Sequence, residues 1–346
     1  MVRRLLFGSL VLAPIAIGVH YAFHRESLDF VLAAIALIPL AWLIGEATEH
    51  AAHHTGPGIG GFLNATFGNA PELIIALFAV ADGLFEVVRG SLTGSVVGNL
   101  LLVLGFSLAF GGRGDLDRPS TFTSLGLVAA AVCLLAIPSV PTWDGDDPNT
   151  HDLAVLSVFP AVVLLVAYLG ATWWSLRRHH GMHTSDESPD MATWSLRRSL
   201  LVLGIATVAT ALIAEILVGS IETFSEKAGL SEFFVAAVIV AIVGNAAEHG
   251  GAVVVAARGN IKLAAEIALA SSAQVAVFLI PAVALLSWLI EPLALSFRPV
   301  ELLSIGTSVV VVTALLFQGR SSRVRGFVLT GAYVAVAATF LAAGDR

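Results

Sequence analysis

Charged residues are scarce in this chain. They make up 12% of its 346 residues, whereas 57% are hydrophobic; an ordinary soluble domain has roughly 25% charged residues. A soluble chain of this length needs a polar surface that so few charges cannot supply, so the composition excludes a soluble enzyme or binding domain. The net charge of −7 and the lack of a clustered basic segment give no indication of a nucleic-acid partner.

Cysteine and the common enzyme signatures are also missing or rare. Cysteine occurs once, at Cys133, so an intramolecular disulfide is impossible. The sequence contains no His-Glu-x-x-His zinc motif, no Gly-x-Ser-x-Gly nucleophile turn and no phosphate-binding Gly-rich loop with Lys. Gly112-Arg113-Gly114-Asp115 imitates an intramembrane aspartyl-protease motif, but it has no partner motif. An intramembrane hydrolase is therefore the least favoured class, and any transport must draw on an ion gradient rather than ATP.

Long apolar runs dominate what is present. Many are near 20 residues, about the length at which a helix crosses roughly 30 Å of hydrocarbon. Backbone groups in lipid are satisfied only in helices or closed barrels, and a barrel would show short alternating segments instead. We therefore predict an all-α integral membrane protein with eleven spans, at about 5–22, 28–50, 58–81, 86–110, 120–140, 151–175, 199–222, 231–257, 262–290, 299–317 and 322–343.

The positions of Lys and Arg predict the orientation. With the N-terminus inside, 13 basic residues fall on inner segments and 5 on outer ones, which accounts for all 18. Positive connections face the cytoplasm, so we expect a cytoplasmic N-terminus and an outer C-terminus, in a prokaryotic cytoplasmic membrane. The first apolar run, which follows Arg3 and Arg4, also fits a signal peptide; a retained first helix is favoured.

The two halves of the chain carry matching motifs. Gly68-Asn69-Ala70-Pro71-Glu72 recurs 176 positions later as Gly244-Asn245-Ala246-Ala247-Glu248, and the same offset pairs Glu46 with Glu222. Five spans separate the copies, and an odd number reverses the direction of crossing, so the repeats are inverted as in many transporters. The predicted parts are an extra transmembrane helix at 1–25, a first five-helix repeat at 26–176, a cytoplasmic linker at 177–198 and a second five-helix repeat at 199–346.

Glu72 and Glu248 lie deep within apolar runs. A carboxylate there costs roughly 2.5–3.5 kcal/mol on insertion scales, so a duplicated pair indicates function. Glycine and proline beside them favour a broken helix whose freed carbonyls face a cation. Such hard oxygen donors suit Ca²⁺, whereas zinc and copper prefer His or Cys. The predicted metal ligands are Glu72, Glu248, Asn69 and Asn245, with Ser95, Asn99, Ser271 and Gln274 as an auxiliary polar site.

The same two carboxylates suit proton coupling. A buried carboxyl group holds a proton more readily, and a bound cation displaces that proton, so the two compete. We predict a secondary active transporter that exchanges Ca²⁺ for H⁺ by alternating access, with both ions as substrates, the lipid bilayer as its surroundings and no permanently bound cofactor. A Na⁺- or K⁺-linked exchanger on the same scaffold and a passive channel are the alternatives, and the oligomeric state is left open.

A second polar cluster lies near the inner end of the second predicted span. Its spacing places Glu46, His50, His53 and His54 on or near one helix face, with Glu49 beside them. A transition-metal site, a sensor of cytoplasmic pH and an ordinary polar helix end are three interpretations, of which the last is favoured. The candidate gating residues are Glu46, Glu49, Glu222 and His50.

At these residues the chain resembles the cation/proton exchanger branch of the calcium/cation antiporter superfamily. The motifs that carry the resemblance are at 60–74, 91–105, 243–249 and 271–274. The resemblance implies Ca²⁺/H⁺ antiport through eleven spans, with Glu72 and Glu248 as shared metal and proton carboxylates. The Gly-Thr-Ser-x-Pro-Glu/Asp core of sodium-coupled relatives is missing, which favours protons over sodium.

Overall fold

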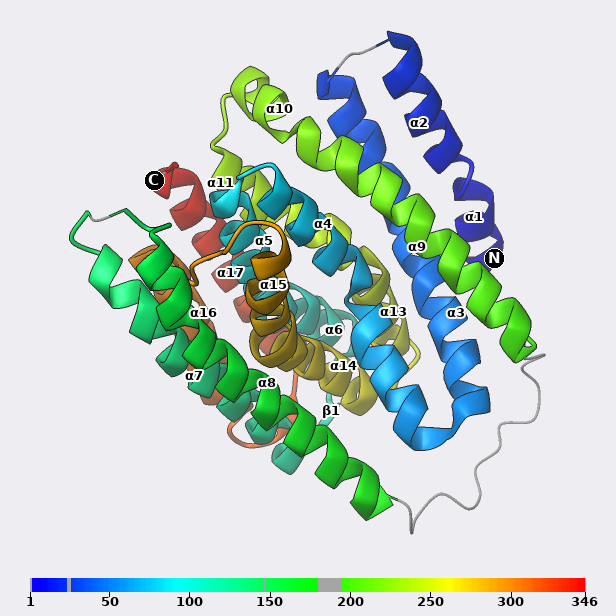
Figure 1. Cartoon of the computed structure of the whole chain (residues 1–346). Coiled ribbons are helices and arrows are strands. Elements are labelled where there is room, and N and C mark those ends of the chain that lie inside the picture. Colours follow the sequence, from blue (N-terminus) through cyan, green and yellow to red (C-terminus); the bar gives the residue numbers. More distant parts are fainter. Residues whose placement is uncertain (1, 24–25, 146, 180–193, 346) are drawn as a thin grey trace.

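The structure, a computed structural model, describes residues 2–23, 26–145, 147–179 and 194–345, and most of them are helical (Figure 1). The α-helices are α1 (Val2–Ser9), α2 (Leu12–Phe23), α3 (Glu26–Gly68), α4 (Ala70–Ala81), α5 (Phe85–Val97), α6 (Leu104–Gly111), α7 (Arg118–Ser139), α8 (His151–His179), α9 (Leu196–Gly219), α10 (Ile221–Ala228), α11 (Glu232–Phe234), α12 (Ala241–Gly244), α13 (Ala246–Ala257), α14 (Ile261–Gln274), α15 (Ile280–Leu286), α16 (Pro299–Leu316) and α17 (Arg323–Ala343).

Shorter elements join or interrupt these helices. The wider π-helical segments are η1 (Gly98–Val103), η3 (Val235–Val240) and η4 (Val275–Leu279), and the 3₁₀ turns are η2 (Val140–Thr142) and η5 (Ser287–Leu289). Strands β1 (Gly114–Asp115) and β2 (Arg320–Ser321) pair antiparallel. π-Helical turns are rare and often lie at functional sites; here η1 contains the predicted site residue Asn99, while η3 and η4 lie next to segments that carry other predicted site residues.

The helices confirm an all-α integral membrane protein. Within the described residues, nine helices are long and apolar enough to cross a membrane, and a pair bent by 110° (Ile221–Ala228 with Glu232–Gly244) gives a tenth. Two predicted spans are each divided at an asparagine: the span at 58–81 between the end of α3 and the 12-residue helix α4, and the span at 231–257 between Glu232–Gly244 and α13. Each piece alone is too short to count as a crossing, although together they occupy the predicted place.

Helix α3 is not a single rod. Figure 1 shows it descending, turning at its lower end and returning alongside itself before α4 begins. Gly60 on the returning arm lies so close to Ala52 on the descending arm that an added Cβ would stand 3.0 Å from the Ala52 Cβ. The spans predicted at 28–50 and 58–81 are therefore both present, and a helical turn within α3 joins them.

The two halves share their backbone irregularities as well as their motifs. Helices α4 and α13 are both 12 residues long, and each follows an asparagine outside helical geometry: Asn69 at φ −98°, ψ 12° and Asn245 at φ −91°, ψ 4°. The helix that comes next continues into a π segment in both halves, α5 into η1 and α14 into η4. The repeat is thus visible in the fold, while the exact boundaries of its two parts stay predictions.

Alternate connections gather at opposite ends of the molecule. At one end, here called the Arg113 face, β1 pairs with β2, and the Lys262 Nζ lies 3.2 Å from the Asp117 Oδ1. At the other end, the Arg89 face, the Arg89 Nη1 donates to the Asn149 Oδ1 at 2.8 Å. Arg89 lies near the start of the continuous span Phe85–Gly111, and Arg113 follows its end. This alternation is what a chain of consecutive membrane crossings requires.

Candidate ion-binding site

The two duplicated glutamates meet at the centre of the fold. Glu72 lies in the first turn of α4 and Glu248 in the first turn of α13. A Cβ added to Gly68 would stand 3.6 Å from the Glu248 Oε1, and one added to Gly244 would stand 3.3 Å from the Glu72 Cγ. Each glutamate therefore lies beside the glycine of the opposite copy, and the structure brings the two predicted motifs close together.

The helix breaks follow from the local sequence. The Leu73 N–H donates to the Asn69 carbonyl at 3.0 Å, and the His249 N–H donates to the Asn245 carbonyl at 2.9 Å, so a new helix starts at each asparagine. Pro71 stands at the start of α4, where a missing N–H removes no helical hydrogen bond. Both glutamates thus lie at the positive end of a helix dipole, which favours negative charge there.

Four of the predicted polar residues form a network across the two halves. The Asn245 Nδ2 donates to the Ser95 Oγ at 2.9 Å, and the Asn99 Nδ2 donates to the Ser271 Oγ at 3.0 Å. The Ser271 hydroxyl in turn donates to the Glu248 Oε2. Each Asn–Ser bond joins one half of the chain to the other, so the auxiliary residues hold the halves together beside the carboxylates.

Several acceptor oxygens in this network are buried without a hydrogen-bond partner among the described residues. They are the Oε2 of Glu72 and the Oδ1 atoms of Asn99 and Asn245. Unpaired acceptors are unfavourable in a buried site unless a donor or a cation satisfies them. Together with the Glu248 carboxylate they form a set of hard oxygen donors, which is the kind that Ca²⁺ takes.

The remaining two predicted residues are placed differently. Asn69 is buried, with 2% of its surface exposed, at the break before α4. Gln274, at the end of α14, is partly buried, and in the part of the chain that the structure describes it forms no hydrogen bond with the other site residues. Its role as an auxiliary ligand stays a prediction.

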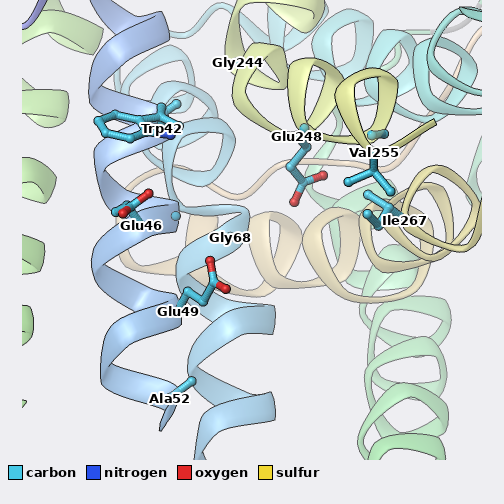
Figure 2. A pocket seen from close by; sticks show the side chains of 13 residues that line it. Trp42, Glu46, Glu49, Ala52, Gly68, Gly244, Glu248, Val255 and Ile267 are labelled. Carbon is cyan, nitrogen blue, oxygen red and sulfur yellow. The ribbon is translucent and has the colours of Figure 1, made fainter. Parts of the chain in front are cut away.

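A cavity of about 520 Å³ leads to the site from one side (Figure 2). Its lining comes from both halves of the chain: Trp42, Glu46 and Glu49 of α3, Gly68, Gly244, Glu248, Val255 and Ile267. On the opposite side, Glu72, Ser91 and Ser95 border a space of only about 10 Å³, which holds roughly one water molecule. The site is therefore open on one side and closed on the other.

The open side faces the Arg113 face. Helix α3 begins near the Arg89 face, because Asp29 at its start shares a hollow with Asp82, which follows α4. Glu46, Glu49 and Ala52 lie farther along its descending arm, toward the other end, and line the cavity. The closed side is sealed by α5 against η3, where a Cβ added to Gly94 would stand 1.9 Å from the Ala237 carbonyl oxygen.

Three of the four candidate gating residues lie at or beside the cavity. Glu46 and Glu49 line it, and the His50 Nε2 lies 3.5 Å from the Glu46 Oε1. The His50 ring also stacks on Trp194, with 4.7 Å between ring centroids, and Trp194 lies near the end of the predicted linker, as the first residue that the structure describes after His179. Glu222 is exposed in α10 and does not line the cavity, so the offset that pairs it with Glu46 does not bring the two together.

The histidine cluster does not assemble as a metal site. Within residues 2–23, 26–145, 147–179 and 194–345, no three His, Cys, Asp or Glu side chains are arranged to hold a metal ion. His54 instead lies with its Nε2 2.7 Å from the Trp194 carbonyl oxygen, and His53 is exposed. The cluster contacts the end of the linker, and most of that linker (180–193) lies outside the described residues.

Sequence reasoning missed a buried charged group at the Arg89 face. Arg89 is 1% exposed, and its Nη1 also donates to the Ala294 carbonyl at 3.3 Å. Glu301, likewise 1% exposed, accepts from the Arg298 N–H at 2.6 Å and from the Thr93 hydroxyl at 3.3 Å. The sequence did contain a signal for this group, because Arg89 is a charged residue inside the predicted span at 86–110 and Glu301 is one inside the span at 299–317. These residues hold the 290–298 connection against α5 at the closed end of the site.

Comparison with known proteins agrees with this geometry. The sequence pattern of one family, described as Sodium/calcium exchanger protein, matches residues 28–177 and again residues 198–342. The chain belongs to this family. One pattern that matches each half separately also supports the internal repeat, and the resemblance to cation/proton exchangers is confirmed.

Individual relatives extend over nearly the whole chain. The Ca(2+)/H(+) antiporter of Synechocystis sp. is 34% identical, over 96% of this chain and 95% of its own length. The Ca(2+)/H(+) antiporter ChaA of Bacillus subtilis is 36% identical, over 90% of this chain and 91% of its own. The solved structure of native YfkE matches with a TM-score of 0.83 at 32% identity, over 99% of this chain and 100% of that one. The chain is thus an integral membrane transporter rather than an enzyme.

Proposed function

We propose that this transporter exchanges Ca²⁺ for H⁺ by alternating access, and that Glu72 and Glu248 bind the cation or protons in competition. The observation that carries the proposal is the contact of each glutamate with the glycine of the opposite repeat. A site built in this way changes shape whenever the two repeats move relative to each other. Two Ca(2+)/H(+) antiporters among the relatives support the choice of ions.

The donor atoms favour a hard divalent cation. Two carboxylates supply the charge, and the unpaired Oδ1 atoms of Asn99 and Asn245 supply neutral oxygens beside them. Ca²⁺ takes six to eight oxygen ligands in flexible geometry. Asn69, Gln274 and the carbonyls freed at the helix breaks are candidates for the remaining positions.

The same carboxylates explain coupling to protons. A metal binds only the ionised carboxylate, so each bound cation excludes the protons and each pair of bound protons excludes the cation. An empty pair would leave two unpaired negative charges in a low-dielectric interior, which is strongly unfavourable. Only filled states therefore cross between the two sides, which makes the transport an exchange.

The cavity supports an inward-open arrangement. It opens toward the Arg113 face, the face that the Lys and Arg distribution predicts to be cytoplasmic. We propose that α5 and η3 separate in the outward-open state, while α3 and α13 close over Glu248. With a cytoplasmic N-terminus and an outer C-terminus, the role in a prokaryotic cytoplasmic membrane is Ca²⁺ export.

A flux measurement tests the proposal directly. ⁴⁵Ca²⁺ uptake into vesicles that contain the purified protein is measured with and without a pH gradient, for the native chain, Glu72→Gln and Glu248→Gln. Uptake requires the gradient, and both substitutions reduce it to the level of protein-free vesicles. The control Glu226→Gln changes an exposed glutamate of α10 outside the cavity and keeps full uptake. Uptake that follows a Na⁺ or K⁺ gradient instead would assign the protein to the alternative exchanger.

A further inference from the structure

Two connections meet at the Arg113 face and form a fixed surface there. One joins α6 to α7 and belongs to the first half, and the other joins α16 to α17 in the second half. In the small sheet, Gly114 is opposite Ser321 and Asp115 is opposite Arg320. The Ser321 hydroxyl donates to the Gly112 carbonyl at 2.8 Å. The side chains on these connections are therefore held in a defined arrangement.

An open cavity of about 520 Å³ lies over this sheet. Three guanidinium groups and one carboxylate line it, so the surface carries a net positive charge; the lining residues are Arg113, Gly114, Asp115, Arg320, Ser321, Ser322 and Arg325. Arg113 and Arg320 are exposed, and neither forms an ion pair with any residue that the structure describes. Arg325 is fixed in place, since its Nη1 donates to the Arg320 carbonyl and its Nη2 to the Gln318 Oε1.

The general bias of basic residues toward one face explains only part of this arrangement. That bias accounts for arginine in each connection, but not for the convergence of three arginines from two connections around one cavity. Guanidinium groups bind phosphate oxygens through paired, charge-assisted hydrogen bonds. The cavity also includes Ser322, the N-cap of the 21-residue helix α17, whose positive end favours an anion. The chemistry of the lining is that of a phosphate site.

The surroundings of the cavity indicate which phosphate it binds. Helices α6 and α17 touch just beneath it, where a Cβ added to Gly326 would stand 2.4 Å from the Ala109 nitrogen. Large apolar side chains next to this contact are exposed: Phe110 by 62%, Val324 by 72% and Phe327 by 67%. In a membrane-spanning chain these side chains face the acyl chains of lipids. A phospholipid there would have its head group at the arginines.

We propose that Arg113, Arg320 and Arg325 bind the phosphate of an anionic phospholipid, whose acyl chains lie along α6 and α17. The lipid would contact a connection from each half of the chain and so restrain their relative motion at the Arg113 face. This site is separate from the glutamates and does not depend on which ions are exchanged.

Native mass spectrometry of the purified protein tests the site. Phosphatidylglycerol and phosphatidylcholine are added in turn to the native chain and to Arg113→Gln/Arg320→Gln, which changes two exposed side chains that make no internal contact needed for folding. We expect the native chain to prefer phosphatidylglycerol and the double variant to bind it about tenfold more weakly, as the loss of a charge-assisted contact predicts. Arg258→Gln, an exposed arginine that follows α13 outside the cavity, keeps native binding.

Three results would overturn the proposal. Equal binding of the two lipids would show that the head group is not recognised. An equal loss in Arg258→Gln would show a general charge effect rather than a site. Displacement of the bound phosphatidylglycerol by millimolar inorganic phosphate would show that the arginines take free phosphate instead of a lipid.

Discussion

At the scale of single residues, the duplicated glutamates have unequal surroundings. Glu248 accepts a hydrogen bond from Ser271, whereas the Glu72 Oε2 has no partner among the described residues. Ser95 is the counterpart of Ser271 in the first repeat, 176 positions earlier. Its hydroxyl accepts a hydrogen bond from the Asn245 side chain, so the pattern at Glu248 is not repeated at Glu72. A symmetric sequence motif therefore produces an asymmetric candidate site, in which the two carboxylates have different hydrogen-bond partners.

This asymmetry makes Ser271 a residue with a measurable role. Ser271→Ala removes a hydrogen bond to the Glu248 carboxylate, and a hydrogen bond to a charged group contributes about 1.5–3 kcal/mol, so we expect the KM for Ca²⁺ in ⁴⁵Ca²⁺ uptake to change by about tenfold or more. The neighbouring Ser272 donates to the Ala268 carbonyl within its own helix, and Ser272→Ala provides the control with native KM. Equal effects of the two substitutions would contradict a role for the Ser271 hydroxyl at Glu248.

At the scale of helices, α5 is the element on which closure depends. Its residues Gly94 and Ser95 face η3 and Asn245 respectively, and its continuation η1 supplies Asn99 to the network. On the same helix, Arg89 donates to Asn149 and Thr93 donates to the buried Glu301, both near the Arg89 face. Helix α5 therefore connects the candidate site with the close packing against η3 that closes one side of it.

Two glycines of this span provide a matched test of that seal. Gly94→Ala places a methyl group 1.9 Å from the Ala237 carbonyl oxygen, whereas Gly98→Ala meets nothing within 4 Å. Overpacking of this kind typically destabilises by about 1–3 kcal/mol, so we expect Gly94→Ala to lower the thermal unfolding midpoint in detergent and to slow uptake. Gly98→Ala should keep both values. Native stability and transport in Gly94→Ala would show that α5 and η3 do not need this close approach.

The sequence predicted much of the geometry of the candidate site because its signals are local. Glycine, asparagine and an early glutamate mark the start of a helix whatever surrounds them, and the duplication made the pattern unmistakable at Glu72 and Glu248. The helical connection between the two arms of α3 and the burial of Arg89 and Glu301 were not predicted. The connection depends on the packing of a helical turn, and the burial depends on partners far away in the sequence, such as Ala294 for Arg89 and Thr93 for Glu301. Hydropathy alone carries no information on either.

At the scale of the whole molecule, the cavity opens to one face only, and cysteine labelling can test which side of the membrane that face is on. Cys133 is the single cysteine, so a Cys133→Ser chain is a clean background for Glu49→Cys in the cavity and Asp147→Cys at the Arg89 face. We expect an impermeant thiol reagent to modify Glu49→Cys only from the cytoplasmic side and Asp147→Cys only from the outside. Labelling in right-side-out and inverted vesicles distinguishes the two.

The labelling pattern tests the orientation of the chain in the membrane and the closure of the candidate site separately. The reverse pattern for both variants would invert the predicted topology while leaving the site intact. Modification of Glu49→Cys from both sides would contradict a seal between α5 and η3. Modification of Asp147→Cys from the cytoplasmic side alone would contradict the placement of alternate connections at opposite faces.

The contact of each glutamate with the opposite glycine has a consequence for how the two halves are compared. Gly68 leaves room for Glu248, and Gly244 leaves room for Glu72. A Cβ at Gly244 would stand 3.3 Å from the Glu72 Cγ, so that side chain would have to shift by a few tenths of an ångström, and a Cβ at Gly68 would stand 3.6 Å from the Glu248 Oε1. A substitution at a glycine of one repeat therefore reaches the carboxylate of the other, and the four positions have to be read together when the two halves are compared.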